Sequence, residues 1–358
     1  MANRSLVAVA GGTAALALAL TGCVVESGST GTAGTTAGSG GAASGSITVA
    51  CGAMEEVCDA WTKAFTAETG IQASFVRLSS GETVARLAAT KSAPEFDVWH
   101  GGPADGFGAA SEQDLIQPYV SPNAAAIPEK YKDADGTWTG VYVGTLGFCS
   151  NKAVLDELGL GLPDSWESLL DPKLKSQVST AHPSTSGTAF TTLWTQVTRL
   201  GSEDAALDYM KKLHANVLQY TKSGTAPGQV AGRGEVAVGI VFSHDCVLYK
   251  ERGMTDLEVS FPSEGTGYEV GGVAIIKGTD NAPAAQAYVD WALTKEAQEL
   301  GPSAGSYQLP TNPDAAIDPR MVDLDSVKLV DYDFAAAAAA KAELTARFDT
   351  EVAAQPKE

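Results

Sequence analysis

The chain has 358 residues, of which 44% are hydrophobic, so it holds enough apolar material to bury cores in about two domains. Acidic residues outnumber basic ones 43 to 24, which gives a formal net charge of -19. This composition excludes global disorder, and the negative field argues against a nucleic-acid partner. A specific anion site remains compatible with it, because short-range hydrogen bonds outweigh a distant, screened field.

The first 22 residues have the pattern of an export signal. Arg4 supplies a positive charge, and 6–20 is an apolar run too short to cross a hydrocarbon core of about 30 Å. The run ends in LTGC, which resembles a bacterial lipobox and predicts lipidation at Cys23. The alternative is an ordinary secretory signal in which Cys23 is incidental.

Residues 23–45 are almost entirely Gly, Ser, Thr and Ala. No core can be built from this composition, so the segment predicts a flexible tether. With Cys23 acylated, the folded body is expected outside the cell, anchored to the outer face of the bacterial cytoplasmic membrane.

Four cysteines follow the signal and tether: Cys51, Cys58, Cys149 and Cys246. An even number in an exported chain favours disulfides, and four cysteines allow three pairings. We expect Cys51–Cys58, because this spacing can join a strand end to the first turns of the next helix, and Cys149–Cys246 by elimination. A metal site is the alternative, but no C-x-x-C or Cys/His spacing supports zinc.

Strand and helix patterns alternate at the start of the folded body. β-rich runs at 46–50, 71–76 and 96–99 are separated by helical patterns at 55–69 and 81–90. Such alternation predicts parallel βαβ units with helices on both faces of the sheet.

Longer β-rich runs follow, and the chain ends in helices. The strand patterns lie at 141–150, 235–242 and 268–276, and the helical patterns at 283–300 and 335–352. An α/β stretch of its own lies between the first and last of these strands. The order therefore predicts two α/β lobes joined by strands that cross from one lobe to the other.

Motifs of common enzyme sites give little support to catalysis. No H-E-x-x-H motif, Walker A loop or dinucleotide fingerprint is present. His244 alone among the histidines has an adjacent acid, Asp245, and adjacent side chains on a helix diverge. A secreted hydrolase is therefore the less favoured class, and we expect no enzyme, no cofactor and no metal.

Three segments place small hydroxyl residues beside glycine where a helix or turn begins. Helix N-termini carry unsatisfied N–H donors, hydroxyls add further donors, and glycine lets an anion approach the backbone. Ordinary N-capping explains any one of these segments, but three together indicate a bound phosphate or phosphonate. The residues expected to bind it are Ser80, Gly81, Ser186, Gly187, Thr188 and Ser223.

Six segments carry a family resemblance: FVRLSSGE, FDVWHGGPADGF, GFCSNKAVL, HPSTSGTAF, YTKSGTAPGQVAGRGEVAVGI and EGTGYEVGGVAIIKG. In this order they resemble the type II solute-binding proteins of ATP-driven importers, in the branch of ferric-ion, phosphonate and sugar-phosphate binders. The resemblance runs from Ser46 to at least Leu300. It implies the two-lobed α/β type II periplasmic-binding-protein fold, with crossing strands near Thr145 and Gly267 as the hinge.

The resemblance also implies the extent of each lobe. Lobe 1 is expected at 46–145 plus 268–358, with C-terminal helices able to contact both lobes, and lobe 2 at 146–267. A protein of this kind binds its solute as a monomer, closes, and delivers it to a permease in the cytoplasmic membrane.

Within this branch the ligand depends on the segment after GEVAVGI. Ferric binders carry paired tyrosines there, whereas this chain has Phe242-Ser-His244-Asp245-Cys246 and no Tyr-Tyr pair anywhere. The anion segment SGTAF is retained. Loss of the iron ligands with retention of the anion segment indicates an organic phosphate, and the His-Asp pair resembles that of hexose-phosphate binders.

The group attached to the phosphate is expected to contact His244, Asp245 and an acid, either Glu269 or Glu264. The alternative for His244 and Asp245 is an ordinary helix N-terminus. Trp99 ends a strand where open α/β sheets bind ligands, so it either stacks on a sugar or packs under the lobe. The favoured function is capture of a hexose phosphate; the alternatives are a 2-aminoethylphosphonate or other organophosphonate binder, then a ferric-ion binder.

Overall fold

The structure is a computed structural model that describes residues 45–356. The predicted signal at 1–22, the lipidation site Cys23 and nearly all of the tether at 23–45 lie outside the described residues.

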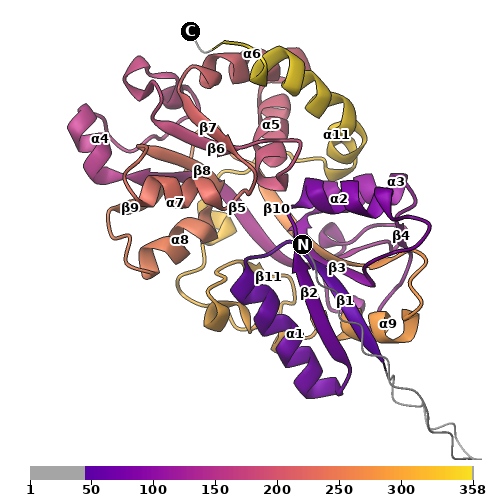
Figure 1. Cartoon of the computed structure of the whole chain (residues 1–358). Helices are drawn as coiled ribbons and strands as arrows, with labels where there is room; N and C mark the ends of the chain where they lie inside the picture. The colour runs from indigo at the N-terminus through magenta and orange to yellow at the C-terminus, as the bar shows by residue number, and fades with distance from the viewer. Residues whose placement is uncertain (1–44, 357–358) are drawn as a thin grey trace, which may run out of the picture. The chain divides into compact units, whose positions relative to one another are not determined.

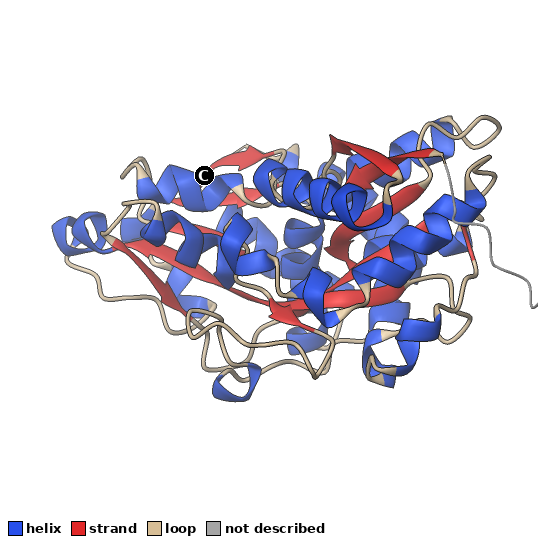
Figure 2. Cartoon of the chain, turned by 90° about the horizontal axis from the view of Figure 1, so that it is seen from below, coloured by secondary structure: helices blue, strands red, loops and turns tan. Residues whose placement is uncertain are grey.

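One mixed sheet of 11 strands organises the described residues, with helices on both sides of it (Figure 2). Its strands are β1 (Ser46–Cys51), β2 (Gln72–Arg77), β3 (Val98–Pro103), β4 (Ile116–Gln117), β5 (Thr139–Asn151), β6 (Val178–Ala181), β7 (Val217–Thr221), β8 (Val238–Phe242), β9 (Leu257–Ser260), β10 (Tyr268–Ile276) and β11 (Leu309–Pro310).

The helices alternate with these strands. They are α1 (Glu55–Thr69), α2 (Ser80–Ala89), α3 (Ala104–Glu112), α4 (Lys152–Leu158), α5 (Gly187–Leu200), α6 (Glu203–His214), α7 (Ala226–Gly232), α8 (Ser243–Glu251), α9 (Ala282–Ala292), α10 (Lys295–Gln298) and α11 (Phe334–Phe348). Short 3-10 segments are η1 (Pro122–Ala125), η2 (Glu129–Tyr131), η3 (Glu167–Leu170), η4 (Pro172–Leu174), η5 (Gly301–Ala304) and η6 (Leu324–Ser326), and a π-helical turn, η7 (Asp349–Ala353), follows α11. Among the described residues, no helix has the length and apolarity needed to span a membrane.

Strand pairing divides the sheet into two parts at β5. The main strand order is β2-β1-β3-β10-β5-β8-β6-β7. The first half of β5 pairs with β10, up to Thr145 opposite Tyr268, and the second half pairs with β8, from Leu146 opposite Phe242. We call the part from β2 to β10 lobe 1 and the part from β8 to β7 lobe 2; β5 runs through both (Figure 1).

The strands cross where the family resemblance implies. Thr145 is the residue of β5 at which the pairing partner changes, and the carbonyl of Gly267 accepts a hydrogen bond from the Leu146 amide at 3.0 Å. The predicted two-lobed α/β fold with crossing strands is therefore confirmed.

Amphipathic helices cover both faces of lobe 1. In α1 the buried residues recur at helical spacing, with Trp61 and Phe65 facing the sheet, and Gly70 ends the helix in the left-handed conformation. The same core includes Tyr288 and Trp291 of α9. On the other face, α2 and α3 pack over a second core that contains Phe107.

The C-terminal helix α11 contacts both lobes. Its apolar side chains Leu344 and Phe348 belong to the core of lobe 2. From the same helix, Lys341 donates to Asp105 of α3 in lobe 1 at 2.9 Å. The assignment of the whole segment 268–358 to lobe 1 stays a prediction, and α11 ties that lobe to its neighbour.

The predicted helix at 283–300 is interrupted in the structure. The side-chain oxygen of Thr294 accepts a hydrogen bond from the amide of Ala297 at 3.2 Å, so it caps a new short helix, α10. A threonine hydroxyl competes with the helical backbone for such donors, which explains the break between α9 and α10.

Candidate ligand-binding site

A cavity lies between the carboxyl ends of the strands of the two lobes. The space between its walls is about 590 Å³, a value that includes open solvent. Its walls include residues at or shortly after the carboxyl ends of β1, β2 and β3 in lobe 1 and of β6, β7 and β8 in lobe 2. Open α/β sheets bind ligands at this edge, because the loops and helix N-termini converge there.

The start of α2 forms one wall of the cavity. Ser79 and Glu82 make a capping box, in which the Glu82 carboxylate accepts from the Ser79 amide at 3.3 Å. The next residue, Ser80, lies in the first turn and lines the cavity. Ser80 is 5% exposed, and no hydrogen bond of its hydroxyl is found among the described residues. The hydroxyl is therefore free to donate to a ligand.

The start of α5 faces Ser80 from lobe 2. The Ser186 side chain caps this helix by accepting from the Ala189 amide at 3.4 Å, which leaves its own O–H as a donor. Gly187 and Thr188 follow in the first turn, where backbone N–H groups have no partner within the helix. A Cβ at Gly187 would lie 2.6 Å from Pro103 Cδ, so only glycine lets the lobes approach this closely.

Arg77 supplies the positive charge of this wall. It ends β2, and its guanidinium donates to the Ala53 carbonyl at 3.2 Å, the Ser79 hydroxyl at 3.3 Å and the Ser223 hydroxyl at 3.1 Å. Among the described residues no carboxylate lies within ion-pair distance of it, and it is the only Lys or Arg that lines the cavity. An unpaired guanidinium beside two helix N-termini forms an anion-binding wall.

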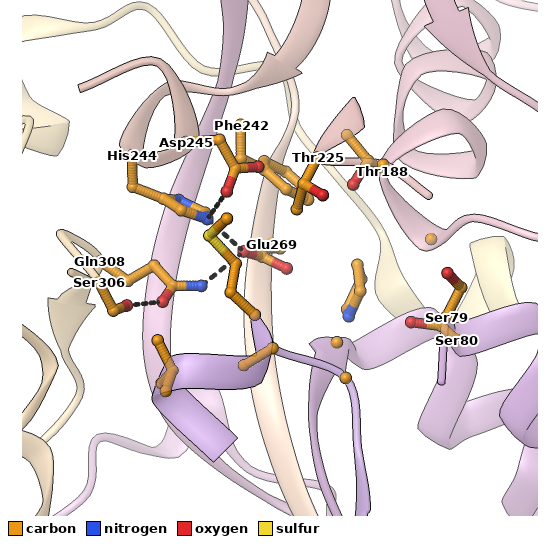
Figure 3. Close-up of a pocket in the computed structure, with 18 of the residues that line it drawn as sticks. Ser79, Ser80, Thr188, Thr225, Phe242, His244, Asp245, Glu269, Ser306 and Gln308 are labelled. Carbon is orange, nitrogen blue, oxygen red and sulfur yellow. Dashed lines mark hydrogen bonds and ion pairs between the residues drawn. The ribbon is translucent and has the colours of Figure 1, made fainter. Parts of the chain in front are cut away.

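The opposite wall of the cavity is acidic. Figure 3 shows Ser79, Ser80, Thr188 and Thr225 on one side, and His244, Asp245, Gln308 and Ser306 on the other. His244 Nε2 lies 3.7 Å from an Asp245 carboxylate oxygen and 3.9 Å from one of Glu269. Asp245 is 2% exposed and Glu269 is 3% exposed. The Gln308 amide donates to Glu269 at 3.2 Å and accepts from Ser306.

Burial sets the protonation of these groups. It raises the pKa of Asp245 to about 7, against the charge of Arg77, which lowers it. It raises the pKa of Glu269 well above the ordinary value, and the Gln308 hydrogen bond opposes that shift. Burial lowers the pKa of His244 to about 3, so this imidazole is neutral. The wall therefore offers both donors and acceptors to ligand hydroxyls.

We expect Asp245→Asn to stabilise the ligand-free protein at pH 8 but not at pH 4. The ordinary pKa of this carboxyl is 3.8 and its folded value is about 7. Between these values the folded state keeps a proton that the unfolded state releases, so stability is lost as the pH rises through this window. Asparagine carries no charge and escapes that loss.

Thermal unfolding from pH 4 to pH 8 measures this effect. Asp59→Asn, at a side chain 46% exposed on α1, is the control and should change little. A shift in Tm for Asp245→Asn that is the same at every pH would contradict the expectation.

Seven of the predicted site residues line the cavity together: Ser80, Ser186, Gly187, Thr188, His244, Asp245 and Glu269. Of the two candidate acids, Glu269 lines the cavity. Glu264 lies in lobe 2, outside the lining, where it accepts from the Trp166 amide at 3.0 Å.

Three predicted residues lie outside the lining. The Gly81 amide donates to the Thr185 carbonyl at 3.1 Å, so it is engaged by lobe 2. The Ser223 hydroxyl accepts from Arg77 and lies 2.9 Å from the Thr225 hydroxyl, which replaces it in the lining. Trp99 is fully buried and stacked on Phe107 at 3.9 Å, so it packs under the lobe.

Arg77, Tyr142, Ser306 and Gln308 line the cavity although sequence reasoning does not select them. Arg77 is separated from the predicted Ser-Ser-Gly segment by one residue, Leu78, and that position is the signal that could have found it. Ser306 and Gln308 follow η5, far along the chain from every other segment, and no motif marks them.

Both expected disulfides are present, and each supports a cavity wall. Cys51–Cys58 joins the end of β1 to α1 on either side of a lining loop, and Cys149–Cys246 joins β5 to α8 just after His244 and Asp245. Among the described residues, no group of three or more His, Cys, Asp or Glu is arranged to hold a metal ion.

A G-x-S-x-G pattern at 301–305 does not form a nucleophile elbow. It lies in η5, and the Ser303 hydroxyl is exposed and donates to the Leu300 carbonyl at 2.7 Å. An elbow requires a strained strand-to-helix turn, whereas Ser303 lies in a 3-10 segment that follows the helix α10.

Two α/β lobes with a polar cavity between them define a type II solute-binding protein, a class that binds solutes outside the cytoplasm for ABC importers. Residues 94–338 match the family of bacterial extracellular solute-binding proteins. The chain belongs to this family, whose members bind solutes without chemistry of their own.

Similar proteins agree with this assignment. A Haemophilus influenzae protein is 44% identical over 279 residues, which cover 76% of this chain and 80% of that one. The structure of the periplasmic binding protein AfuA from Actinobacillus pleuropneumoniae, with exogenous fructose-6-phosphate bound, is 40% identical with a TM-score of 0.84, covering 87% of this chain and 99% of that one. A Salmonella typhimurium protein provisionally described as a 2-aminoethylphosphonate-binding periplasmic protein is 26% identical over 66% of this chain and 68% of its own length.

Proposed function

We propose that this protein captures a hexose phosphate by closing its two lobes over the ligand. The observation that carries the proposal is the division of the cavity into an anion-binding wall and an acidic wall. A phosphate ester of a sugar has the same division, with an anion at one end and hydroxyls at the other. The likeness to AfuA, solved with fructose-6-phosphate, supports the same ligand class.

The anion wall suits a phosphate group. Arg77 offers a charged donor, Ser80 and Ser186 offer hydroxyls, and the first turns of α2 and α5 offer backbone amides. Hydrogen bonds between charged partners are about twice as strong as neutral ones. The phosphate therefore supplies most of the affinity.

The acidic wall suits a neutral polyol. Asp245 and Glu269 accept hydrogen bonds when ionised and donate when protonated, and neutral His244 does either. Gln308 adds an amide beside Glu269. A sugar hydroxyl is both donor and acceptor, so this mixed wall can satisfy it.

Closure is supported by contacts that join the lobes. They include the Gly81 amide with the Thr185 carbonyl, Arg77 with Ser223, and Arg252 with Glu56 at 3.1 Å. We place the moving bodies at 46–145 plus 268–358 and at 146–267, with the hinge at Thr145 and Gly267.

We further propose that Cys23 is lipidated and holds the monomeric protein at the outer face of the cytoplasmic membrane, where it meets its permease. Cys23→Ala should leave the protein with an uncleaved signal or release it. Membrane fractionation with mass measurement checks this, and a membrane-bound variant of normal mature mass would exclude lipidation.

A second candidate is an organophosphonate such as 2-aminoethylphosphonate. The observation that favours it is the pair of buried carboxylates, Asp245 and Glu269, which have no Lys or Arg within ion-pair distance among the described residues. An ammonium group would fill that place. The neutral donors Gln308 and His244 favour the sugar instead.

Calorimetry with a ligand panel tests the function. The panel holds hexose phosphates, 2-aminoethylphosphonate, inorganic phosphate and ferric citrate. Tight binding of at least one hexose phosphate, with weaker binding of the rest, is expected. Tight binding of 2-aminoethylphosphonate with no response to any hexose phosphate would replace the proposed function by the second candidate.

A further inference from the structure

Charge is distributed unequally along the cavity. Arg77 is the only Lys or Arg in the lining, and it lies in the anion wall. The acidic wall holds two buried carboxylates, Asp245 and Glu269, and a neutral imidazole. The cavity therefore has a positively charged side chain to bind an anionic group at one end only.

Cations near the cavity are already engaged elsewhere. Arg252 pairs with Glu56 at 3.1 Å and Lys222 lies 4.0 Å from Glu82, in pairs that are largely exposed. Behind the lining, Lys341 pairs with Asp105 at 2.9 Å. None of these three side chains lines the cavity.

We propose that the cavity accepts sugar monophosphates and rejects sugar bisphosphates. This inference rests on the proposed function, because it takes the first phosphate to lie in the anion wall. A hexose phosphorylated at both ends then places its second phosphate beside Asp245 and Glu269. That wall selects against it by charge.

Rejection follows because the second phosphate would lie beside two buried acids, in a part of the cavity that has no Lys or Arg in its lining. A phosphate ester carries between about one and a half and two negative charges at neutral pH. Juxtaposed like charges in a binding site strongly disfavour the wrong partner. Binding would also require Asp245 and Glu269 to keep their protons while the second phosphate loses its hydration. We expect the bisphosphate to bind at least about a hundredfold more weakly than the monophosphate.

Calorimetry with two matched pairs tests the inference: fructose 6-phosphate against fructose 1,6-bisphosphate, and glucose 6-phosphate against glucose 1,6-bisphosphate. The expected result is tight binding of a monophosphate and at least about a hundredfold weaker binding of its bisphosphate. Glu269→Gln should narrow that ratio by about tenfold, because it replaces a buried acid, which would have to stay protonated beside a phosphate, by a neutral amide that can donate to the phosphate. Glu296→Gln, at a side chain 67% exposed on α10, makes the same substitution outside the cavity and should leave the ratio unchanged.

The results of this titration distinguish failure of the charge selection from failure of the proposed function. If a monophosphate binds and its bisphosphate binds equally well, the proposed function stands and charge selection is wrong. If the bisphosphate is rejected but Glu269→Gln and Asp245→Asn both keep the full ratio, size or shape rejects it and the inference is overturned. If no hexose monophosphate binds, the proposed function fails and the inference falls with it.

Discussion

Gly187→Val is expected to reduce ligand affinity by at least about a hundredfold while leaving the fold intact. A Cβ at this position would lie 2.6 Å from Pro103 Cδ and 3.0 Å from the Ser80 hydroxyl. Both neighbours belong to lobe 1, whereas Gly187 begins α5 in lobe 2. The clash therefore arises only when the lobes are together, and the open protein avoids it.

The size of the effect follows from the contacts that closure makes. A valine side chain at this position holds the two lobes apart. The α5 N-terminus and Ser186 of lobe 2 then stay too far from a phosphate bound at Ser80 and Arg77 of lobe 1. Each charge-assisted hydrogen bond contributes about 1.5–3 kcal/mol, and about 1.4 kcal/mol corresponds to a tenfold change in affinity. Loss of two such contacts accounts for the expected hundredfold.

Gly161→Val is the matched control. Among the described residues, a Cβ at Gly161 would meet no atom within 4 Å, and neither Gly161 nor Gly187 has a left-handed backbone angle. Both variants should keep the Tm of the parent protein. Ligand titration measures the affinity, and small-angle X-ray scattering measures whether ligand still closes the lobes. If Gly187→Val still closes its lobes on the ligand and keeps full affinity, then Gly187 is not needed for lobe closure.

The fold could be predicted from the sequence because the hydrophobic pattern of each segment determines its secondary structure. The helix at 55–69 and the strand at 268–276 are predicted with the bounds that the structure gives to α1 and β10. Their signals are a periodic buried face ended by Gly70 and an apolar run between turn residues. The break at Thr294 was missed, because a capping hydroxyl within a helical pattern gives only a weak local signal.

The sequence predicts the candidate site mainly where several of its residues are neighbours in the chain. Ser186, Gly187 and Thr188 form a recognisable helix start, and His244 and Asp245 another. Gly81 and Ser223 look equivalent in sequence. In the structure the Gly81 amide bonds to the Thr185 carbonyl, and the Ser223 hydroxyl bonds to Arg77. These contacts join segments from different lobes, which a local pattern cannot reveal.

Arg77→Met is expected to weaken phosphate binding by more than about a hundredfold. Arg77 is the only Lys or Arg that lines the cavity, and no carboxylate neutralises it among the described residues. Methionine keeps the apolar stem of the side chain but none of its donors. The loss includes two guanidinium contacts to the anion at about 1.5–3 kcal/mol each, and the bridge to Ser223 that joins the lobes.

A second consequence adds to this loss. The charge of Arg77 lowers the pKa of Asp245 against the effect of burial. Without Arg77 the pKa of Asp245 rises further, so the carboxyl keeps its proton at neutral pH and gains an O–H donor. A ligand hydroxyl that donates to the ionised carboxylate is then left with the weaker carbonyl acceptor of the protonated acid. The variant should therefore bind poorly at both ends of the ligand.

Arg77→Lys separates charge from geometry. Lysine keeps a point charge but cannot reach Ala53, Ser79, Ser223 and an anion together, because it lacks the planar fork of arginine. Its affinity should lie between those of the parent and Arg77→Met. The matched control is Arg86→Met on α2; the Arg86 side chain is 42% exposed and pairs with Glu95 outside the cavity.

Calorimetry of the three variants against a hexose phosphate at low and high salt decides the role of Arg77. If Arg77 contacts the phosphate, Arg77→Met loses both affinity and the part of the salt dependence that one charge pair carries, since screening acts only on charges that remain. Arg86→Met should behave as the parent does. Equal affinity in Arg77→Met and Arg86→Met would mean that the phosphate lies elsewhere, and that Arg77 serves only to hold the loop at Ala53 against lobe 2.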